Sequence, residues 1–142
     1  GAIEPPALPT HKIEPPATTN PVAWGRYIAV AQLECYSCHS ADFKTNDMAN
    51  PEKSAGFFGG GNKLLSPDGK EIFTRNLTMD EETGLGRWTE EEFVKALKYG
   101  QSPHGTLRPP MARYPYLTDG EAKAIFAYLK TIPKIKHNIP RN

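Results

Sequence analysis

The residues best suited to carry chemistry lie together at Cys35–His39, where the chain reads Cys-Tyr-Ser-Cys-His. This order matches the C-x-x-C-H pattern through which c-type haem is attached. Two thiols separated by two residues can each form a thioether with one of the two vinyl groups on the same porphyrin edge. The adjacent histidine can then turn beneath the ring and bind the iron. We therefore predict one covalent haem c at Cys35 and Cys38, with His39 as an axial iron ligand.

Three other uses of a cysteine pair fit this sequence less well. A structural zinc site needs four ligands, but the chain has only two cysteines, and His11, His104 and His137 are scattered. A thioredoxin-like redox pair needs a preceding strand, whereas the pattern before Cys35 is helical. A disulfide across two intervening residues would remove little chain entropy. Haem attachment remains the interpretation that uses all the residues of the motif.

A second axial ligand would decide whether the iron exchanges electrons or binds small molecules. Candidate donors are the side chains of Met48, Met79, Met111, His11, His104 and His137. Met79 falls in an acidic loop and is expected to be half-exposed, and His104 sits in a turn-like segment typical of a surface histidine. Met111 follows two prolines, so rigid backbone could present its thioether opposite His39. We predict Met111 as the second ligand, the alternative being a loop methionine that fills the core.

Three helices are predicted to position these ligands. The first begins with Asn20 as N-cap and Pro21 at the first position. It then carries an apolar face that runs directly into Cys35, made by Trp24, Tyr27, Ile28 and Ala31. Thr89 and Thr118 each precede a glutamate by three residues, a capping box that opens two later helices. The second helix should close at Gly100 and the third, with an apolar stripe at Ala122, Ile125, Phe126 and Leu129, should stop at Pro133.

Between these helices, residues 40–87 are rich in glycine and turn signals, with one short extended piece predicted at residues 71–74. So long an irregular region is uncommon in a compact domain unless its loops serve a function. A porphyrin, as a large apolar body, would complete the core around which these loops wrap.

The two ends of the chain differ from its body in composition. Residues 1–20 are rich in proline and repeat an Ile-Glu-Pro-Pro-Ala unit, which predicts an extended linker or tether. Residues 21–133 form the predicted domain, and residues 134–142 look like a solvated basic tail. The formal net charge of +1 argues against a nucleic-acid-binding protein. No apolar run approaches the length of a membrane helix, and no leader is visible, so an export signal is expected to lie outside this sequence.

The motif, the late methionine and the ending Ala127-Tyr128-Leu129 resemble a class I monohaem cytochrome c over residues 21–133. Within that family, residues 74–93 are similar to the N-[IL]-T-P-D … T-G-[IL]-G-x-W run of cytochrome subunits and domains that serve membrane-associated dehydrogenases and respiratory complexes. Two positions depart from the pattern. Met79 stands where the family often has proline, and Met111 is preceded rather than followed by proline.

The resemblance implies a small all-α cytochrome c fold in which the first and last helices cross. Gly25 would be the point of close approach, facing Ile125, Tyr128 or Leu129. It also implies haem propionates that accept hydrogen bonds, for which Arg75, Trp88 and Tyr114 are the candidate donors, although each could equally serve the surface or the core.

The expected function is one-electron transfer through a haem with His39 and Met111 as axial ligands, not enzymatic catalysis. Redox proteins such as a dehydrogenase, an oxidase or a respiratory complex are the expected partners. The alternative is a haem enzyme or gas-binding sensor with an open distal iron site. Because haem c is attached after export, we expect a periplasmic location or the outer face of the bacterial cytoplasmic membrane, with the N-terminal linker as a possible membrane tether.

Overall fold

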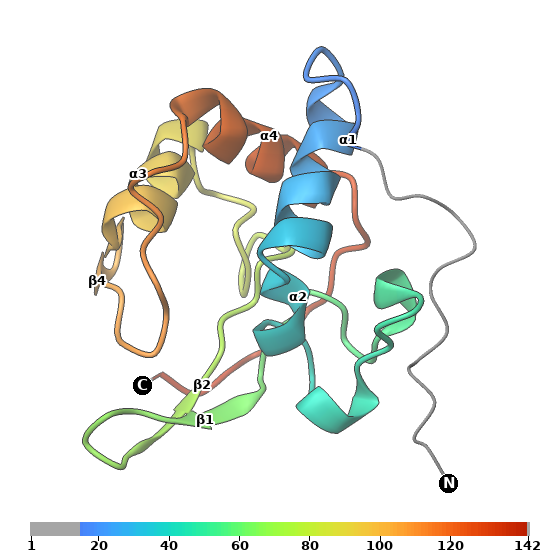
Figure 1. The fold of residues 1–142 in the computed structure, drawn as a ribbon. Helices are drawn as coiled ribbons and strands as arrows, with labels where there is room; N and C mark the ends of the chain where they lie inside the picture. Colours follow the sequence, from blue (N-terminus) through green and yellow to red (C-terminus); the bar gives the residue numbers. More distant parts are fainter. Residues whose placement is uncertain (1–14, 142) are drawn as a thin grey trace, which may run out of the picture.

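Helices, two small sheets and long loops make up the computed structural model of this chain, which describes residues 15–141 (Figure 1). Most of the predicted linker, residues 1–14, lies outside the described residues, as does His11. The elements in chain order are α1 (Pro21–Arg26), the π-helix η1 (Tyr27–Gln32), α2 (Cys35–Cys38), the 3-10 turns η2 (Phe43–Thr45) and η3 (Pro51–Lys53), β1 (Lys63–Leu65), β2 (Glu71–Phe73), α3 (Glu90–Tyr99), β3 (Gln101–Ser102), β4 (Gly105–Thr106) and α4 (Asp119–Leu129).

The first helical stretch begins as predicted but is not one continuous helix. Asn20 caps α1, its side-chain oxygen accepting a hydrogen bond from the Ala23 N–H at 3.2 Å. The helix then widens into η1, where the Leu33 N–H donates to the Ile28 carbonyl at 2.8 Å. Glu34 adopts a left-handed conformation with φ 53°, which ends the helix and redirects the chain into α2. The prediction that the helix runs directly into Cys35 is therefore wrong, because the helix breaks between Gln32 and Cys35.

Both later helices carry the predicted capping boxes. Thr89 and Glu92 cap each other at the start of α3, and Thr118 and Glu121 do the same for α4. Gly100, with φ 73°, ends α3 as expected. Helix α4 ends at Leu129, four residues before Pro133, where the sequence predicts its end.

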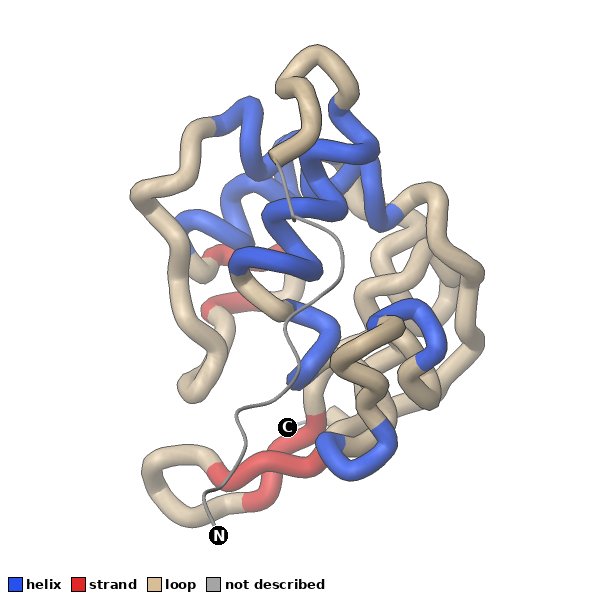
Figure 2. Tube along the Cα trace, turned by 45° about the vertical axis from the view of Figure 1, so that its right-hand side comes forward, coloured by secondary structure: helices blue, strands red, loops and turns tan. Residues whose placement is uncertain are grey.

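The prediction of an all-α fold is not confirmed, because two antiparallel two-stranded sheets accompany the helices. β1 pairs with β2 so that Lys63 lies opposite Phe73 and Leu65 opposite Glu71. The extended piece predicted at residues 71–74 is thus a strand except for its last residue, Thr74. β3 and β4 form a second hairpin after α3. Figure 2 shows the two sheets, in red, at separate places on the molecule. Each is short, so the fold remains mostly helical and small.

The crossing of α1 and α4 organises the core (Figure 1). At Gly25 the two backbones come so close that an added Cβ would overlap the Ala124 carbonyl, which confirms a packing role for this glycine. The nearest neighbours are Ala124 and Ile125, one helical turn before the predicted Tyr128 and Leu129. The predicted apolar stripe of α4 is buried throughout.

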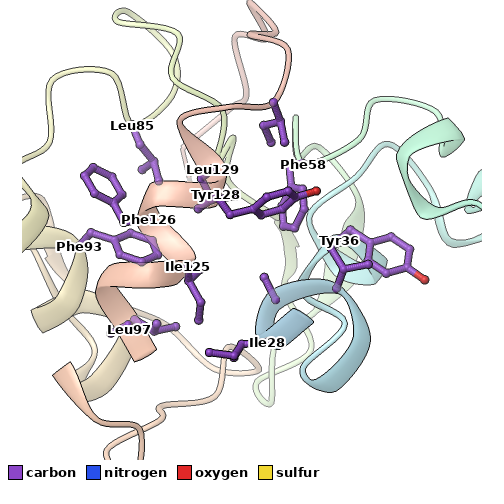
Figure 3. Packing of buried hydrophobic residues seen from close by; sticks show 14 of the residues in the cluster. Ile28, Tyr36, Phe58, Leu85, Phe93, Leu97, Ile125, Phe126, Tyr128 and Leu129 are labelled. Carbon is purple, nitrogen blue, oxygen red and sulfur yellow. The ribbon is translucent and has the colours of Figure 1, made fainter. Parts of the chain in front are cut away.

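Aromatic side chains from the irregular region complete this core (Figure 3). Phe58, which is fully buried, packs edge-to-face against Tyr128 at 6.3 Å between ring centroids. Phe93 of α3 stacks on Phe126 of α4 at 4.9 Å. The loop that carries Phe58 therefore packs on α4.

The last described segment, residues 134–141, has no regular secondary structure and is called the C-terminal arm below. Its basic side chains, Lys134, Lys136 and Arg141, are exposed as predicted. Its backbone, however, is hydrogen-bonded to the body, for example through the Ile135 carbonyl, which accepts from Asn76 Nδ2 at 2.7 Å. The arm therefore returns along the irregular region and does not extend freely into solvent.

Candidate haem-binding site

A single helical turn presents the two cysteines. In α2, the Ser37 hydroxyl donates to the Glu34 carbonyl at 2.7 Å and so closes the turn from its start. Residues three apart in a helix share a face, so Cys35 and Cys38 project from the same side. Both thiols are free and half-buried. One flat ligand with two reactive arms can therefore reach both sulfur atoms.

The surroundings of the cysteines are poorly solvated. Burial raises the pKa of the Cys35 thiol to about 12. Burial also raises the pKa of Tyr114, with further contributions from Cys35 and Cys38, so the phenol lies close to the cysteine pair. Tyr114 is tied to α3 by its backbone N–H, which donates to the Leu97 carbonyl at 3.0 Å. This face suits a large apolar ligand better than a hydrated ion.

His39 follows at the end of α2 with one ring nitrogen already committed. Its backbone N–H donates to the Cys35 carbonyl at 3.0 Å. The ring Nδ1 lies 2.9 Å from the Arg75 carbonyl oxygen, which can only accept, so Nδ1 carries the proton. Burial lowers the pKa of His39, which keeps the imidazole neutral. Nε2 makes no hydrogen bond to any described residue, which leaves its lone pair available, the state required of a histidine that binds metal.

Two buried donors near this segment lack partners among the described residues. They are the Arg75 Nε and the Asn62 Nδ2. The residues are neighbours across the loop, because the Thr74 N–H donates to the Asn62 carbonyl at 3.0 Å. Burial lowers the pKa of Arg75, and so does the nearby positive charge of Arg141. An anionic group such as a haem propionate would accept hydrogen bonds from both donors. It would also offset the neighbouring positive charges of Arg75 and Arg141.

Together these observations fit a haem: two thiols on one face, a histidine with a free nitrogen, an apolar lining and unpaired buried donors. Asn62 was not among the residues predicted from the sequence. Its only signal there is a polar residue directly after a glycine run, which does not reveal that the side chain is buried without a partner.

Trp88 is half-buried and packs on the edge of the core. Its ring lies 6.3 Å from that of His104, at the exposed turn between β3 and β4, where a surface histidine was expected. Of the three predicted propionate donors, Arg75 thus has an unsatisfied nitrogen, Tyr114 lies near the cysteines, and Trp88 is placed by its packing on the core and on His104.

The three methionines occupy different environments. Met79 is buried in the core, 9% exposed, so the expectation of a half-exposed loop residue is wrong. In the loop directly before Met79, the Thr78 N–H donates to the Asn76 Oδ1 at 2.9 Å. Met48 is 60% exposed, and its sulfur accepts a hydrogen bond from the Tyr36 hydroxyl at 3.2 Å. Met111 is half-buried in the loop before α4, following a turn closed by its N–H and the Arg108 carbonyl at 3.2 Å.

Comparison with known proteins gives a consistent picture. The cytochrome subunit of fructose dehydrogenase from Gluconobacter japonicus is 34% identical over 128 residues, which cover 88% of this chain and 24% of that protein. The cytochrome c subunit of gluconate 2-dehydrogenase from Pantoea cypripedii is 34% identical over 73% of this chain and 21% of its own length. The cytochrome c subunit of a quinone alcohol dehydrogenase from Gluconobacter oxydans is 33% identical over 73% of this chain.

The chain thus spans about a quarter or less of the length of these relatives. The family model for cytochrome c matches residues 25–133, which include the cysteine pair, His39 and Met111. Members of that family hold haem c, with its iron, through covalent bonds to the protein. The matched range covers most of the chain, and the chain therefore belongs to the cytochrome c family.

Proposed function

We propose that this chain relays single electrons between redox proteins through one haem c with His39 and Met111 as axial ligands. The observation that carries the proposal is the arrangement at α2. There, two thiols share one face, and the next side chain is a neutral imidazole whose Nδ1 is engaged and whose Nε2 is free. Haem c, when bound, supplies one-electron exchange between ferric and ferrous iron.

The residues of the chain have separate tasks in this proposal. Cys35 and Cys38 would hold the haem covalently, and His39 would bind its iron. Met111 would close the other side with a thioether, which favours the ferrous state relative to a second imidazole. Arg75 and Asn62 would hold the propionates with their unpaired nitrogens. The buried aromatic side chains would help to keep water away from a bound haem.

The relatives suggest the kind of partner. Three of them are named as cytochrome or cytochrome c subunits of fructose, gluconate and alcohol dehydrogenases. We infer that this chain likewise receives electrons from a dehydrogenase and passes them to a respiratory acceptor, and that it is an electron carrier and not the catalytic unit. We also propose export to the periplasm or the outer face of the cytoplasmic membrane, because haem c is attached after export. Among the described residues, no helix has the length and apolarity to cross a bilayer.

Carbon monoxide distinguishes this carrier from a haem enzyme or gas sensor. The holoprotein is reduced with dithionite, exposed to carbon monoxide and followed by its visible spectrum, and is then titrated with a one-electron oxidant. We expect no spectral change with carbon monoxide and one oxidising equivalent per haem. Rapid carbon monoxide binding by the native, reduced protein would contradict the proposal and favour an open distal site.

A further inference from the structure

The C-terminal arm lies against the two loop segments that hold His39. We infer that the arm positions the Arg75 carbonyl and, through it, the imidazole of His39. The arm would thereby influence the reduction potential of the iron from outside the haem pocket. This inference rests on the proposed function in one respect, namely that His39 binds the iron.

His39 is held from two sides. The Gly60 N–H donates to the His39 carbonyl at 3.0 Å, and the His39 Nδ1 donates to the Arg75 carbonyl at 2.9 Å. The two supporting segments are joined to each other, because the Gly61 N–H donates to the Thr74 carbonyl at 2.8 Å. The orientation of the ring therefore depends on where residues 59–61 and 74–76 are placed together.

The arm is bound to the second segment at Arg75 itself and at the residues that follow it, Asn76 and Thr78. The Arg75 Nη2 donates to the Pro140 carbonyl at 2.7 Å. One residue on, Asn76 Nδ2 donates to the Ile135 carbonyl at 2.7 Å, and the Ile135 N–H in turn donates to the Thr78 hydroxyl at 3.0 Å. The Arg75 carbonyl therefore sits in a short stretch of backbone whose side chains at Arg75 and Asn76 are bound to the arm.

The same arm also covers the glycine segment. The His137 Nδ1 lies 3.2 Å from the Gly59 carbonyl oxygen, and a side chain on Gly61 would overlap the His137 ring. The His137 N–H donates to the Thr83 hydroxyl at 3.0 Å, which ties the arm to the next loop. Ile135 packs so closely on Gly59 that an added Cβ would lie 2.9 Å from its Cδ1. The C-terminal arm thus contacts both segments that hold His39, residues 59–61 and residues 74–76.

The consequence for the iron follows from the hydrogen bond at Nδ1. A carbonyl acceptor fixes the orientation of a metal-binding imidazole and raises its basicity. Loosening the arm would let residues 74–76 move, so this bond would open more often. A weaker Nδ1 hydrogen bond makes the imidazole a poorer donor to ferric iron, and the reduction potential should rise.

The test compares three variants of the haem-loaded protein: a chain that ends at Lys134, His137→Ala, and the control Lys136→Ala. Lys136 belongs to the same arm, but its side chain is exposed and pairs with Glu82 at 3.0 Å on the solvent side. The first readout is the solvent exchange rate of the His39 Nδ1 proton in the diamagnetic ferrous state, measured by NMR and normalised to the slowest backbone amides. The second is the midpoint reduction potential.

We expect exchange of the Nδ1 proton to be about tenfold faster in the shortened chain, about threefold faster in His137→Ala, and changed less than twofold in Lys136→Ala. The potential should rise in the first two variants and stay constant in the control. If His137→Ala keeps its haem and shows wild-type exchange and potential, the inference is overturned. Should the shortened chain fail to fold, the comparison of the two point variants decides. Absence of haem ring-current shifts on the wild-type His39 ring would instead overturn the proposed function, and the inference with it.

Discussion

Replacing Gly25 by alanine tests how closely α1 and α4 must approach to shape the haem-bearing core. The added Cβ would lie 1.9 Å from the Ala124 carbonyl oxygen and 2.9 Å from the Ile125 nitrogen. Both are backbone atoms, so no side chain can rotate away. An ordinary contact begins at 3.4 Å, so the helices would have to separate by about 1.5 Å at their crossing.

Overpacking of this kind costs about 1–3 kcal/mol, and a backbone obstacle places Gly25→Ala at the upper end of that range. The better helix propensity of alanine returns about 1 kcal/mol, which leaves a net loss of about 2 kcal/mol. For a body of this size, we expect the melting temperature of the haem-loaded protein to fall by about 7 °C. Circular dichroism at a helix wavelength measures the transition.

Gly120→Ala is the matched control. Gly120 lies in the exposed first turn of α4, where an added Cβ would meet only the Thr118 hydroxyl at 3.8 Å. Its melting temperature should equal or exceed that of the wild type. If Gly25→Ala also unfolds within about 1 °C of the wild type, the crossing is not as tight as described and the packing argument fails.

Three further predictions concern the cofactor, the linker and the partners. The acid-denatured protein should retain the mass of one haem, and the double variant Cys35→Ser/Cys38→Ser should lose it on acid–acetone extraction; extractable haem in the wild type would refute covalent attachment. Deleting residues 1–19 should shift the melting temperature by less than about 2 °C, because a proline-rich linker buries little apolar surface; a larger fall would mean that it packs on the body. Electron-transfer rates with a partner, measured by stopped flow, should fall less than about tenfold from low to physiological ionic strength, since a net charge of +1 gives little long-range steering. A hundredfold drop would indicate a charged docking patch.

Features specified by neighbouring residues could be predicted from the sequence. The capping boxes at Thr89 and Thr118 need only a glutamate three residues on, and both are present in the structure. Gly25 stood out as a glycine within an apolar helical stripe, and its packing role is confirmed. The cysteine pair and His39 form one contiguous motif, so their juxtaposition required no knowledge of the fold.

Features that depend on distant partners could not be predicted in the same way. Glu34 adopts a left-handed conformation that its neighbours in the sequence do not indicate, so the sequence predicts a continuous helix there. Met79 is drawn into the core although its neighbours in the sequence are acidic. The C-terminal arm looked like a solvated tail because its bonds join Ile135 and Pro140 to residues 57 to 65 positions earlier. Pairing over such distances leaves no periodic trace in the sequence.

The most direct test of the central claim is the ferric spectrum of Met111→Ala, compared with Met79→Ala and Met48→Ala. The account predicts that Met111→Ala alone keeps its covalent haem but loses the long-wavelength band of methionine–iron ligation. In this variant the reduction potential should fall, and the reduced protein should bind carbon monoxide. The other two variants should keep the band, because Met79 fills the core and the Met48 sulfur is engaged by Tyr36. Loss of the band in Met79→Ala, with the band intact in Met111→Ala, would contradict the account.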